Sequence, residues 1–223
     1  MSKIVVLISG RRGSGKDYFA EHLQRLLAPG CERRAFADAV KVAAAKEFGW
    51  DYQRLMTDRD YKEKHRAQLI EFAETKKMWL GNGYWAQQLL VAPIAADYLV
   101  VSDWRFEAEY EAMRSTPGVR VVTVRIEVGL KTWMARGFHY NAAVDEHPSE
   151  TELDDFEVDV RCSRDAADAL TLKKILVVLK AVTDRNARDL EPIAAQRGVA
   201  LECGQALHHA EPVGGAYGDN AGH

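Results

Sequence analysis

The chain has 223 residues, of which 47% are hydrophobic and 28% charged, and its formal net charge is −3. That apolar fraction supports a packed core and excludes wholesale disorder, while the slightly acidic balance argues against sequence-independent nucleic-acid binding, which needs a basic face. Three widely separated cysteines without a C-x-x-C pair predict reduced thiols. No run approaches the roughly 18 apolar residues of a membrane span, so we expect a cytoplasmic protein with one α/β domain (1–184).

The first 30 residues predict a phosphate-binding loop. Ile4 to Ile8 have the composition of a buried parallel strand, and apolar residues at helical spacing after Lys16 predict a helix that ends near Gly30. The glycines between these elements let backbone N–H groups surround an anion at the positive end of the helix. The alternative is a glycine-rich turn that binds no ligand. We assign the following residues to the nucleotide phosphates: Gly10, Arg11, Arg12, Gly13, Ser14, Gly15, Lys16 and Asp17.

The loop departs from the usual G-x-x-x-x-G-K-[ST] pattern at one position. Gly10, Gly15 and Lys16 fit, but Asp17 stands where a hydroxyl residue normally contacts Mg²⁺. Lys16 supplies a mobile positive charge for the outer phosphates. Because a carboxylate is larger than a hydroxyl group and negatively charged, we expect Asp17 to hold Mg²⁺ through a metal-bound water.

Residues 36–95 are predicted to be largely helical, and the kinase resemblance described below implies that this segment binds the phosphate acceptor. Right-handed crossovers would fold this segment over the P-loop edge of the sheet. In it we expect Lys62 and Arg66 to bind an acceptor phosphate, and Tyr84 or Trp85 to stack on an acceptor base. The alternatives are a solvated charged face for the two cations and core packing for the indole. The segment follows a short strand over 33–36, and its helices are predicted over 38–48, 51–55, 61–78 and 84–95.

A second informative stretch follows the strand predicted from Leu99 to Val101. Asp103 lies at its carboxyl end and Arg105 comes two residues later. Ligands of open α/β sheets bind outside the carboxyl ends of the strands. A carboxylate there can hold the water shell of Mg²⁺ or, for an alcohol acceptor, take its proton, while an arginine stabilises the transferring charge. The alternative for Asp103 is an N-cap of the helix predicted over 106–113.

After a strand over 119–126, the kinase resemblance described below implies a lid over about residues 130–150. Closing a lid excludes water, which a kinase needs in order to avoid hydrolysing ATP. Arg136 of the lid, like Arg12 and Arg105, is a candidate to stabilise transferring charge. The remaining elements are a short strand over 158–160, an amphipathic helix over 165–183, and an extension over 185–223 whose Gly- and Ala-rich end is expected to be disordered.

Three motifs together resemble one group of P-loop kinases. SGRRGSGKD at 9–17, VVSDWRF at 100–106 and HPSETELDDF at 147–156 are similar to motifs of bacteriophage deoxynucleoside monophosphate kinases. The related animal-type phosphomevalonate kinases share much of the pattern, including a P-loop that ends in Asp and a YKE-x-x-R segment, matched here by 61–66. Phage kinases that act on hydroxymethyl-pyrimidine bases within DNA also look similar.

The third motif decides how the resemblance is weighed. It implies that His147, Ser149 and Glu150 bind substrate, and it favours the phage deoxynucleotide kinases, whereas the YKE-x-x-R segment favours the phosphomevalonate kinases. The residues alone, without the resemblance, predict that His147 is a lone surface histidine and that Ser149 and Glu152 form a capping box.

We therefore expect a three-layer P-loop kinase fold, a parallel sheet of about five strands with helices on both faces. The expected activity is transfer of the γ-phosphate of Mg-ATP to a small phosphorylated acceptor, with a deoxynucleoside monophosphate favoured and phosphomevalonate or 5-hydroxymethyluracil in phage DNA as alternatives. The rival from another class is a nucleotide-binding protein without enzymatic activity. If the chain is phage-encoded, the compartment is the cytoplasm of the host cell. A DNA acceptor would need a basic groove, for which the candidates are Arg33, Arg34, Lys41, Lys62, Lys64 and Arg66.

Overall fold

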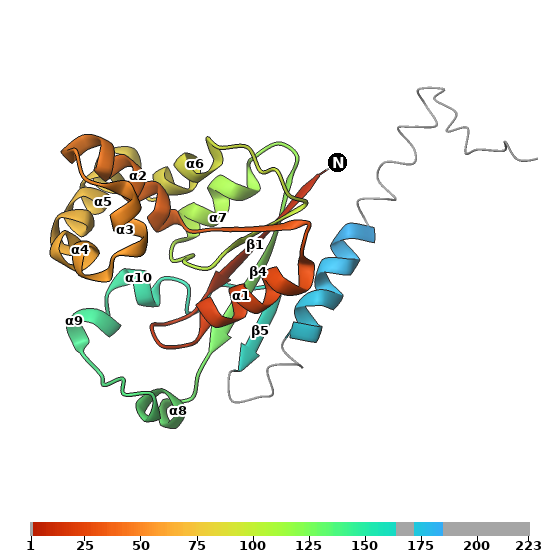
Figure 1. Cartoon of the computed structure of the whole chain (residues 1–223). Coiled ribbons are helices and arrows are strands. Elements are labelled where there is room, and N and C mark those ends of the chain that lie inside the picture. The colour runs from red at the N-terminus through yellow and green to blue at the C-terminus, as the bar shows by residue number, and fades with distance from the viewer. Residues whose placement is uncertain (1, 164–171, 185–223) are drawn as a thin grey trace, which may run out of the picture. The chain divides into compact units, whose positions relative to one another are not determined.

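The centre of the fold is a five-stranded sheet, in a computed structural model that describes residues 2–163 and 172–184 (Figure 1). The strands are hydrogen-bonded in the order β2-β3-β1-β4-β5, and every neighbouring pair is parallel. The predicted parallel sheet is therefore confirmed. The strand bounds are β1 (Lys3–Ser9), β2 (Cys31–Arg34), β3 (Tyr98–Val101), β4 (Val119–Glu127) and β5 (Val160–Ser163).

Helices cover both faces of this sheet, as expected for a three-layer arrangement (Figure 1). A further helix runs over 172–184. The named helices of the described residues are α1 (Lys16–Leu27), α2 (Phe36–Phe48), α3 (Tyr52–Thr57), α4 (Arg59–Lys64), α5 (Arg66–Leu80), α6 (Tyr84–Leu90), α7 (Glu107–Arg114), α8 (Leu130–Ala135), α9 (Ala142–Asp145) and α10 (Pro148–Thr151).

Alternate side chains of β1 enter two separate hydrophobic cores. Val5 and Leu7 belong to a core that includes buried residues of α2, α5, α6 and α7. Ile4, Val6 and Ile8 belong to the other, which includes α1 and the helix 172–184. A strand places successive side chains on opposite faces, so a continuous apolar run is needed where both faces are covered. The strand that leads into the P-loop is thereby held firmly between two layers.

The helix predicted over 61–78 is two helices. α4 ends at Lys64 and α5 begins at Arg66, with His65 between them at φ −99° and ψ 2°. The His65 ring lies against the rings of Trp50 and Tyr61, with centroid distances of 4.2 and 4.6 Å. These contacts join residues from different elements, so the periodicity of the charged stretch could not reveal the bend.

The helix predicted over 84–95 ends early, at Leu90. Pro93 follows, and a proline disfavours the helical conformation of the residue before it. Arg34 of β2 binds the carbonyl oxygens of Leu89, Ala92 and Pro93 at 3.1, 2.8 and 2.7 Å, which satisfies groups left open beyond the helix.

The described residues 2–163 and 172–184 belong to one compact unit. The predicted extension over 185–223 and the start of the predicted helix 165–183 lie outside the described residues. Cys31 on β2 and Cys162 on β5 lie at opposite edges of the sheet, so they form no disulfide with each other. In the part of the chain that the structure describes, none of the helices is both long and apolar enough to cross a membrane.

Candidate active site

The glycine loop joins the carboxyl end of β1 to the first turn of α1, at the middle of the sheet. Gly13 and Gly15 have φ values of 74° and 94°, in the left-handed region that favours glycine. A Cβ atom at Gly13 would also lie 2.7 Å from the Phe138 ring. Both positions therefore need glycine; the P-loop pattern specifies Gly15, and the close approach of Phe138 adds the requirement at Gly13.

Lys16 begins α1 and is half-buried. Burial lowers the pKa of its ammonium group, and the nearby positive charge of Arg105 lowers it further. Two cations beside a helix N-terminus attract an anion that can lie between them. This arrangement suits a polyphosphate.

Arg105 is held between the P-loop and the segment around α10. Its Nη1 donates to the carbonyl oxygens of Gly10 at 3.2 Å and Ser149 at 3.1 Å, and it lies 2.9 Å from Glu150 Oε1. The other carboxylate oxygen of Glu150 accepts from the Arg12 backbone N–H at 2.7 Å. Glu150 thus contacts the phosphate loop itself in this structure, and its role toward substrate stays a prediction.

The segment predicted as a lid lies against the P-loop, with α8, α9 and α10 arranged around it (Figure 1). Arg12 donates to both carboxylate oxygens of Asp145, from Nε at 2.7 Å and from Nη2 at 2.8 Å. Trp133 Nε1 donates to the Arg12 carbonyl oxygen at 2.9 Å, and Arg136 Nη1 donates to the Gly13 carbonyl oxygen at 2.8 Å. Together with Arg105, all three predicted charge-stabilising arginines are therefore bound to the protein in this conformation.

Asp145 was not identified by the sequence analysis. The Arg12 guanidinium and the Asn141 N–H hold the pKa of this carboxyl down to about 2. Its neighbour Glu146 is also acidic, so only the fold distinguishes the residue that reaches the P-loop.

A cavity of about 610 Å³ opens beside the P-loop, within the range typical of small-ligand sites. Arg11, which was assigned to the phosphates, forms an ion pair with Asp154, a residue that also pairs with Arg125. Ser14 Oγ is buried and has no hydrogen-bond partner among the described residues. Side chains of the P-loop, β4 and the lid line the cavity, among them Arg11, Ser14, Ile126, Leu130, Trp133 and Tyr140.

Asp17 is exposed and is held by one of its two carboxylate oxygens. Oδ1 accepts from Arg33 Nη2 at 2.7 Å and from Ser102 Oγ at 2.9 Å. No cluster of three or more His, Cys, Asp or Glu side chains that could hold a metal occurs within 2–163 and 172–184.

Asp103 stabilises the N-terminus of α2. Its Oδ1 accepts from the Phe36 N–H at 2.9 Å and its Oδ2 from the Ala37 N–H at 2.8 Å. The prediction that Asp103 could cap the next helix in sequence is wrong, because Glu109 does so from within α7 and accepts from the Arg105 N–H at 2.8 Å. Burial raises the pKa of Asp103. Its role at Mg²⁺ stays a prediction.

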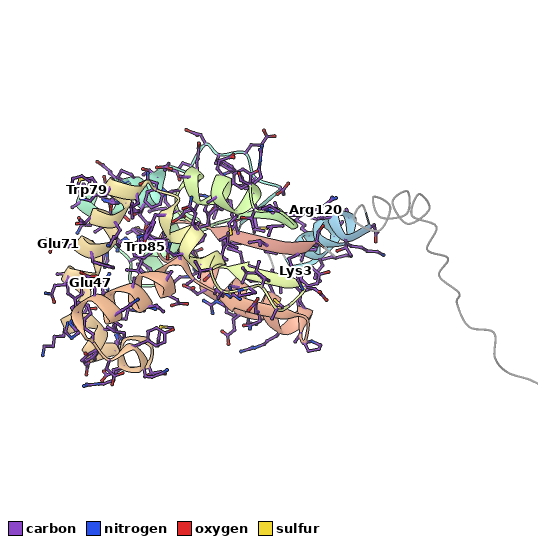
Figure 2. The ribbon with its side chains drawn as sticks, turned by 90° about the horizontal axis from the view of Figure 1, so that it is seen from above. Lys3, Glu47, Glu71, Trp79, Trp85 and Arg120 are labelled. Atoms are coloured by element: carbon purple, nitrogen blue, oxygen red, sulfur yellow. The ribbon has the colours of Figure 1, made fainter. Side chains whose placement is uncertain are left out.

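The predicted acceptor residues of the helical segment fall into two groups. Lys62 and Arg66 lie on exposed faces of α4 and α5, where Arg66 is 3.3 Å from Glu63. Trp85 is 3% exposed and its Nε1 donates to the Ala73 carbonyl oxygen at 3.2 Å. Figure 2 shows it among the helices. Its ring therefore packs in the core, which was the alternative, and does not offer a face for an acceptor base; Tyr84 beside it is half-buried.

His147 and Ser149 interact with each other at the start of α10. His147 Nδ1 accepts from the Ser149 N–H at 3.2 Å and lies 2.8 Å from the Ser149 hydroxyl. The predicted capping box of Ser149 and Glu152 is wrong, because the Glu152 carboxylate accepts from the Glu107 N–H of α7 at 2.9 Å. His147 is the N-cap residue instead.

Three of the six basic residues predicted for a DNA groove are bound to other groups of the protein, while Lys62, Lys64 and Arg66 are exposed. Arg33 contacts Asp17 and Ser102, Arg34 binds carbonyl oxygens beyond α6, and Lys41 lies 2.8 Å from Asp38. These side chains hold the fold together at the carboxyl ends of β2 and β3.

A central strand, glycine loop and helix, with Lys16 at the helix start and Arg136 donating to the loop at Gly13, define this chain as a P-loop kinase. Residues 8–118 match the model of a family described as "Phosphomevalonate kinase". The chain is 34% identical over 155 residues to a phosphomevalonate kinase of Drosophila melanogaster, and this match covers 68% of the chain and 82% of the relative. The chain belongs to the phosphomevalonate kinase family. The weight that the sequence analysis gave to phage deoxynucleotide kinases is not supported by these matches.

Solved structures with a related arrangement are more distant. TT1252 from Thermus thermophilus is 16% identical, with a TM-score of 0.49 and coverage of 81% of this chain and 98% of that one. A shikimate kinase from Acinetobacter baumannii is 11% identical, with a TM-score of 0.46 and coverage of 81% and 94%.

Proposed function

We propose that this enzyme transfers the γ-phosphate of ATP to phosphomevalonate, forming a diphosphate product and ADP. The observation that carries the proposal is the match to the family and to the fly phosphomevalonate kinase. The matched range 8–118 contains the P-loop, the YKE-x-x-R segment with Lys62 and Arg66, and the pair Asp103 and Arg105. The sequence pattern alone favoured a deoxynucleoside monophosphate, and the family now makes phosphomevalonate the first acceptor to test.

A phosphate acceptor agrees with the state of the carboxylates in the site. An oxygen of the acceptor phosphate attacks the γ-phosphorus, the bond to the β–γ bridging oxygen breaks, and ADP leaves. A phosphate monoester is largely ionised near neutral pH, since its second pKa is about 6, so this reaction requires no general base. Both oxygens of Asp103 already accept backbone N–H bonds, which makes it poorly suited to take a proton from an alcohol.

The cations of the site neutralise charge on the transferring group. Phosphoryl transfer depends mainly on positioning and on electrostatic stabilisation. Lys16 lies at the N-terminus of α1, and Arg105 contacts the loop at Gly10. Arg136 lies on the loop at Gly13, so exchanging that carbonyl oxygen for a phosphate oxygen would bring it onto the nucleotide. Lys62 and Arg66 are assigned to the phosphate of the acceptor.

The donor set of the site fits a nucleotide-bound Mg²⁺. This ion prefers one or two carboxylates together with substrate phosphates and water, rather than a cage of protein side chains. Asp17 supplies such a carboxylate next to Lys16. When bound, Mg²⁺ would supply further neutralisation of the phosphate oxygens. The cavity of about 610 Å³ between the P-loop and Trp133 offers room for the nucleoside part of ATP.

The test is an acceptor panel with Mg-ATP, followed by ADP release and by detection of the phosphorylated product. The panel contains phosphomevalonate, mevalonate, deoxynucleoside monophosphates and DNA with 5-hydroxymethyluracil. We expect turnover with phosphomevalonate. With mevalonate, which lacks the acceptor phosphate, we expect turnover to be at least about 100-fold slower, the order of magnitude that follows from losing a bidentate phosphate contact. Turnover with a deoxynucleotide and none with phosphomevalonate would refute the proposal.

A further inference from the structure

Arg33, Asp17 and Ser102 form a closed set of hydrogen bonds beside the P-loop. Arg33 Nη2 donates to Asp17 Oδ1 at 2.7 Å and to Ser102 Oγ at 3.1 Å. Ser102 Oγ donates in turn to the same Asp17 oxygen at 2.9 Å. The three residues come from the end of β2, the start of α1 and the position just after β3, so the set exists only when the sheet is assembled.

The two carboxylate oxygens of Asp17 differ in their hydrogen bonding. Both contacts go to Oδ1, while Oδ2 has no hydrogen-bond partner within the described residues. The Asp17 side chain is 70% exposed, whereas Ser102 is 1% exposed. The hydroxyl group accepts from Arg33, so its own proton is directed at Asp17. A buried donor and a charged donor thus fix one oxygen and turn the other outward.

An exposed carboxylate next to a phosphate site has two physical problems. Its negative charge repels a nucleotide, and its side chain has rotamer freedom that must be lost before it can hold a metal-bound water. Arg33 compensates the charge, and the two hydrogen bonds to Oδ1 restrict the rotamer. A hydroxyl residue at this position of a P-loop needs neither, which gives a reason for both partners in a chain where Asp17 replaces it.

We infer that Arg33 and Ser102 are positioning residues that act on the Mg²⁺-nucleotide through Asp17, by holding Oδ1 and presenting Oδ2 to the metal's water shell. The inference rests on the proposed function only in requiring a bound Mg-nucleotide; it is independent of the acceptor.

The test measures ADP binding by calorimetry, without turnover, at low and saturating free Mg²⁺. Ser102→Ala removes the hydroxyl without a change of charge, and Arg33→Met removes the guanidinium while keeping the length of the side chain. We expect each to weaken Mg²⁺-dependent ADP binding about tenfold, the usual effect of losing one hydrogen bond to a charged group. Arg33→Lys should restore part of the loss, and the thermal midpoint of each variant reports whether the fold is retained.

The same substitutions in an Asp17→Asn background separate indirect from direct action. If both residues act through Asp17, substituting either one should change Mg²⁺-dependent ADP binding by no more than about twofold in that background. The reason is that the effects of substitutions at coupled residues are not additive. Arg25→Met is the matched control, since Arg25 lies on an exposed face of the same helix α1 and pairs with Glu21.

An equal loss in both backgrounds would overturn the inference, because it would mean that Arg33 or Ser102 contacts the ligand directly. So would unchanged binding in the native background. A wild-type protein that binds Mg-ADP but does not phosphorylate phosphomevalonate would refute the proposed acceptor and leave this inference intact.

Discussion

Replacing Glu109 by glutamine should remove much of the pH dependence of stability. Glu109 is 4% exposed, and its Oε2 accepts from the N–H groups of Arg105 at 2.8 Å and Phe106 at 3.1 Å. Burial is the main reason why its pKa is raised from 4.5 to about 8, with the nearby charge of Asp103 adding to it. Glu109→Gln keeps an acceptor oxygen for the two backbone groups but carries no charge at any pH.

The sign and size follow from proton linkage. The folded pKa lies above the unfolded one, so between pH 4.5 and about 8 the native state binds a proton that the unfolded chain has released. The free energy of unfolding therefore falls as pH rises through this window and levels off above it. One pKa unit corresponds to about 1.4 kcal/mol, so the loss of stability across the window is at most about 5 kcal/mol.

Urea unfolding of the native and variant chains at pH values from 5 to 9 measures this directly. We expect the free energies of unfolding of the two chains to differ little at pH 5. At pH 9 the variant should be more stable by several kcal/mol, on the order of the stability that the native chain loses between pH 4.5 and about 8. Glu107→Gln is the control, because Glu107 is exposed on the same helix α7. Parallel pH curves for the native chain and Glu109→Gln would refute the reasoning, since Glu109 would then be ionised throughout.

Three further outcomes concern the site. Lys16→Ala should abolish phosphoryl transfer with an unchanged unfolding midpoint, and substantial residual turnover would contradict its assignment. Asp17→Ser should shift the Mg²⁺ concentration needed for half-maximal rate; an unchanged Mg²⁺ dependence would deny Asp17 a metal role. Asp145→Asn should speed hydrogen exchange over residues 130–150. Because the pKa of Asp145 is about 2, the native contact with Arg12 should persist as pH falls and be lost only through that value. Protection factors, which correct the exchange rates for the intrinsic effect of pH, should therefore be equal at pH 7 and pH 5, and a difference between them would argue against the contact.

The parts of the site that could be predicted from the sequence are those whose conformation depends on residues close by in the chain or on the parallel sheet. The glycine loop needs left-handed backbone at Gly13 and Gly15, which a sequence displays as glycine, and the strand before it is a continuous apolar run because both its faces are covered. Arg105 was found because it follows the carboxyl end of a strand next to the P-loop strand. In each case the neighbours that matter lie within a few residues or are dictated by the parallel sheet.

The parts that the sequence did not predict depend on distant partners. Asp103 was expected to act at a metal or to cap the helix that follows it, but the backbone groups that it binds belong to α2. Asp145 and Glu109 lie among other acidic residues, and only the fold determines which carboxylate reaches Arg12 or enters the core. Trp85 is a residue type that often stacks on bases, but here its ring is buried in the core and is not available for stacking.

The register of the sheet has a consequence for how the enzyme comes to be active. β1 pairs with β3 through Ile4 and Tyr98, and with β4 through Lys3 and Val119, so the strand that carries the P-loop acquires its neighbours from far along the chain. Such non-local pairings form slowly. During synthesis, the glycine loop and Lys16 leave the ribosome before the strands β3 and β4 that support β1. Nucleotide binding should therefore be one of the last properties that the growing chain gains, and a fluorescent ADP analogue would report completion of the sheet rather than formation of the loop.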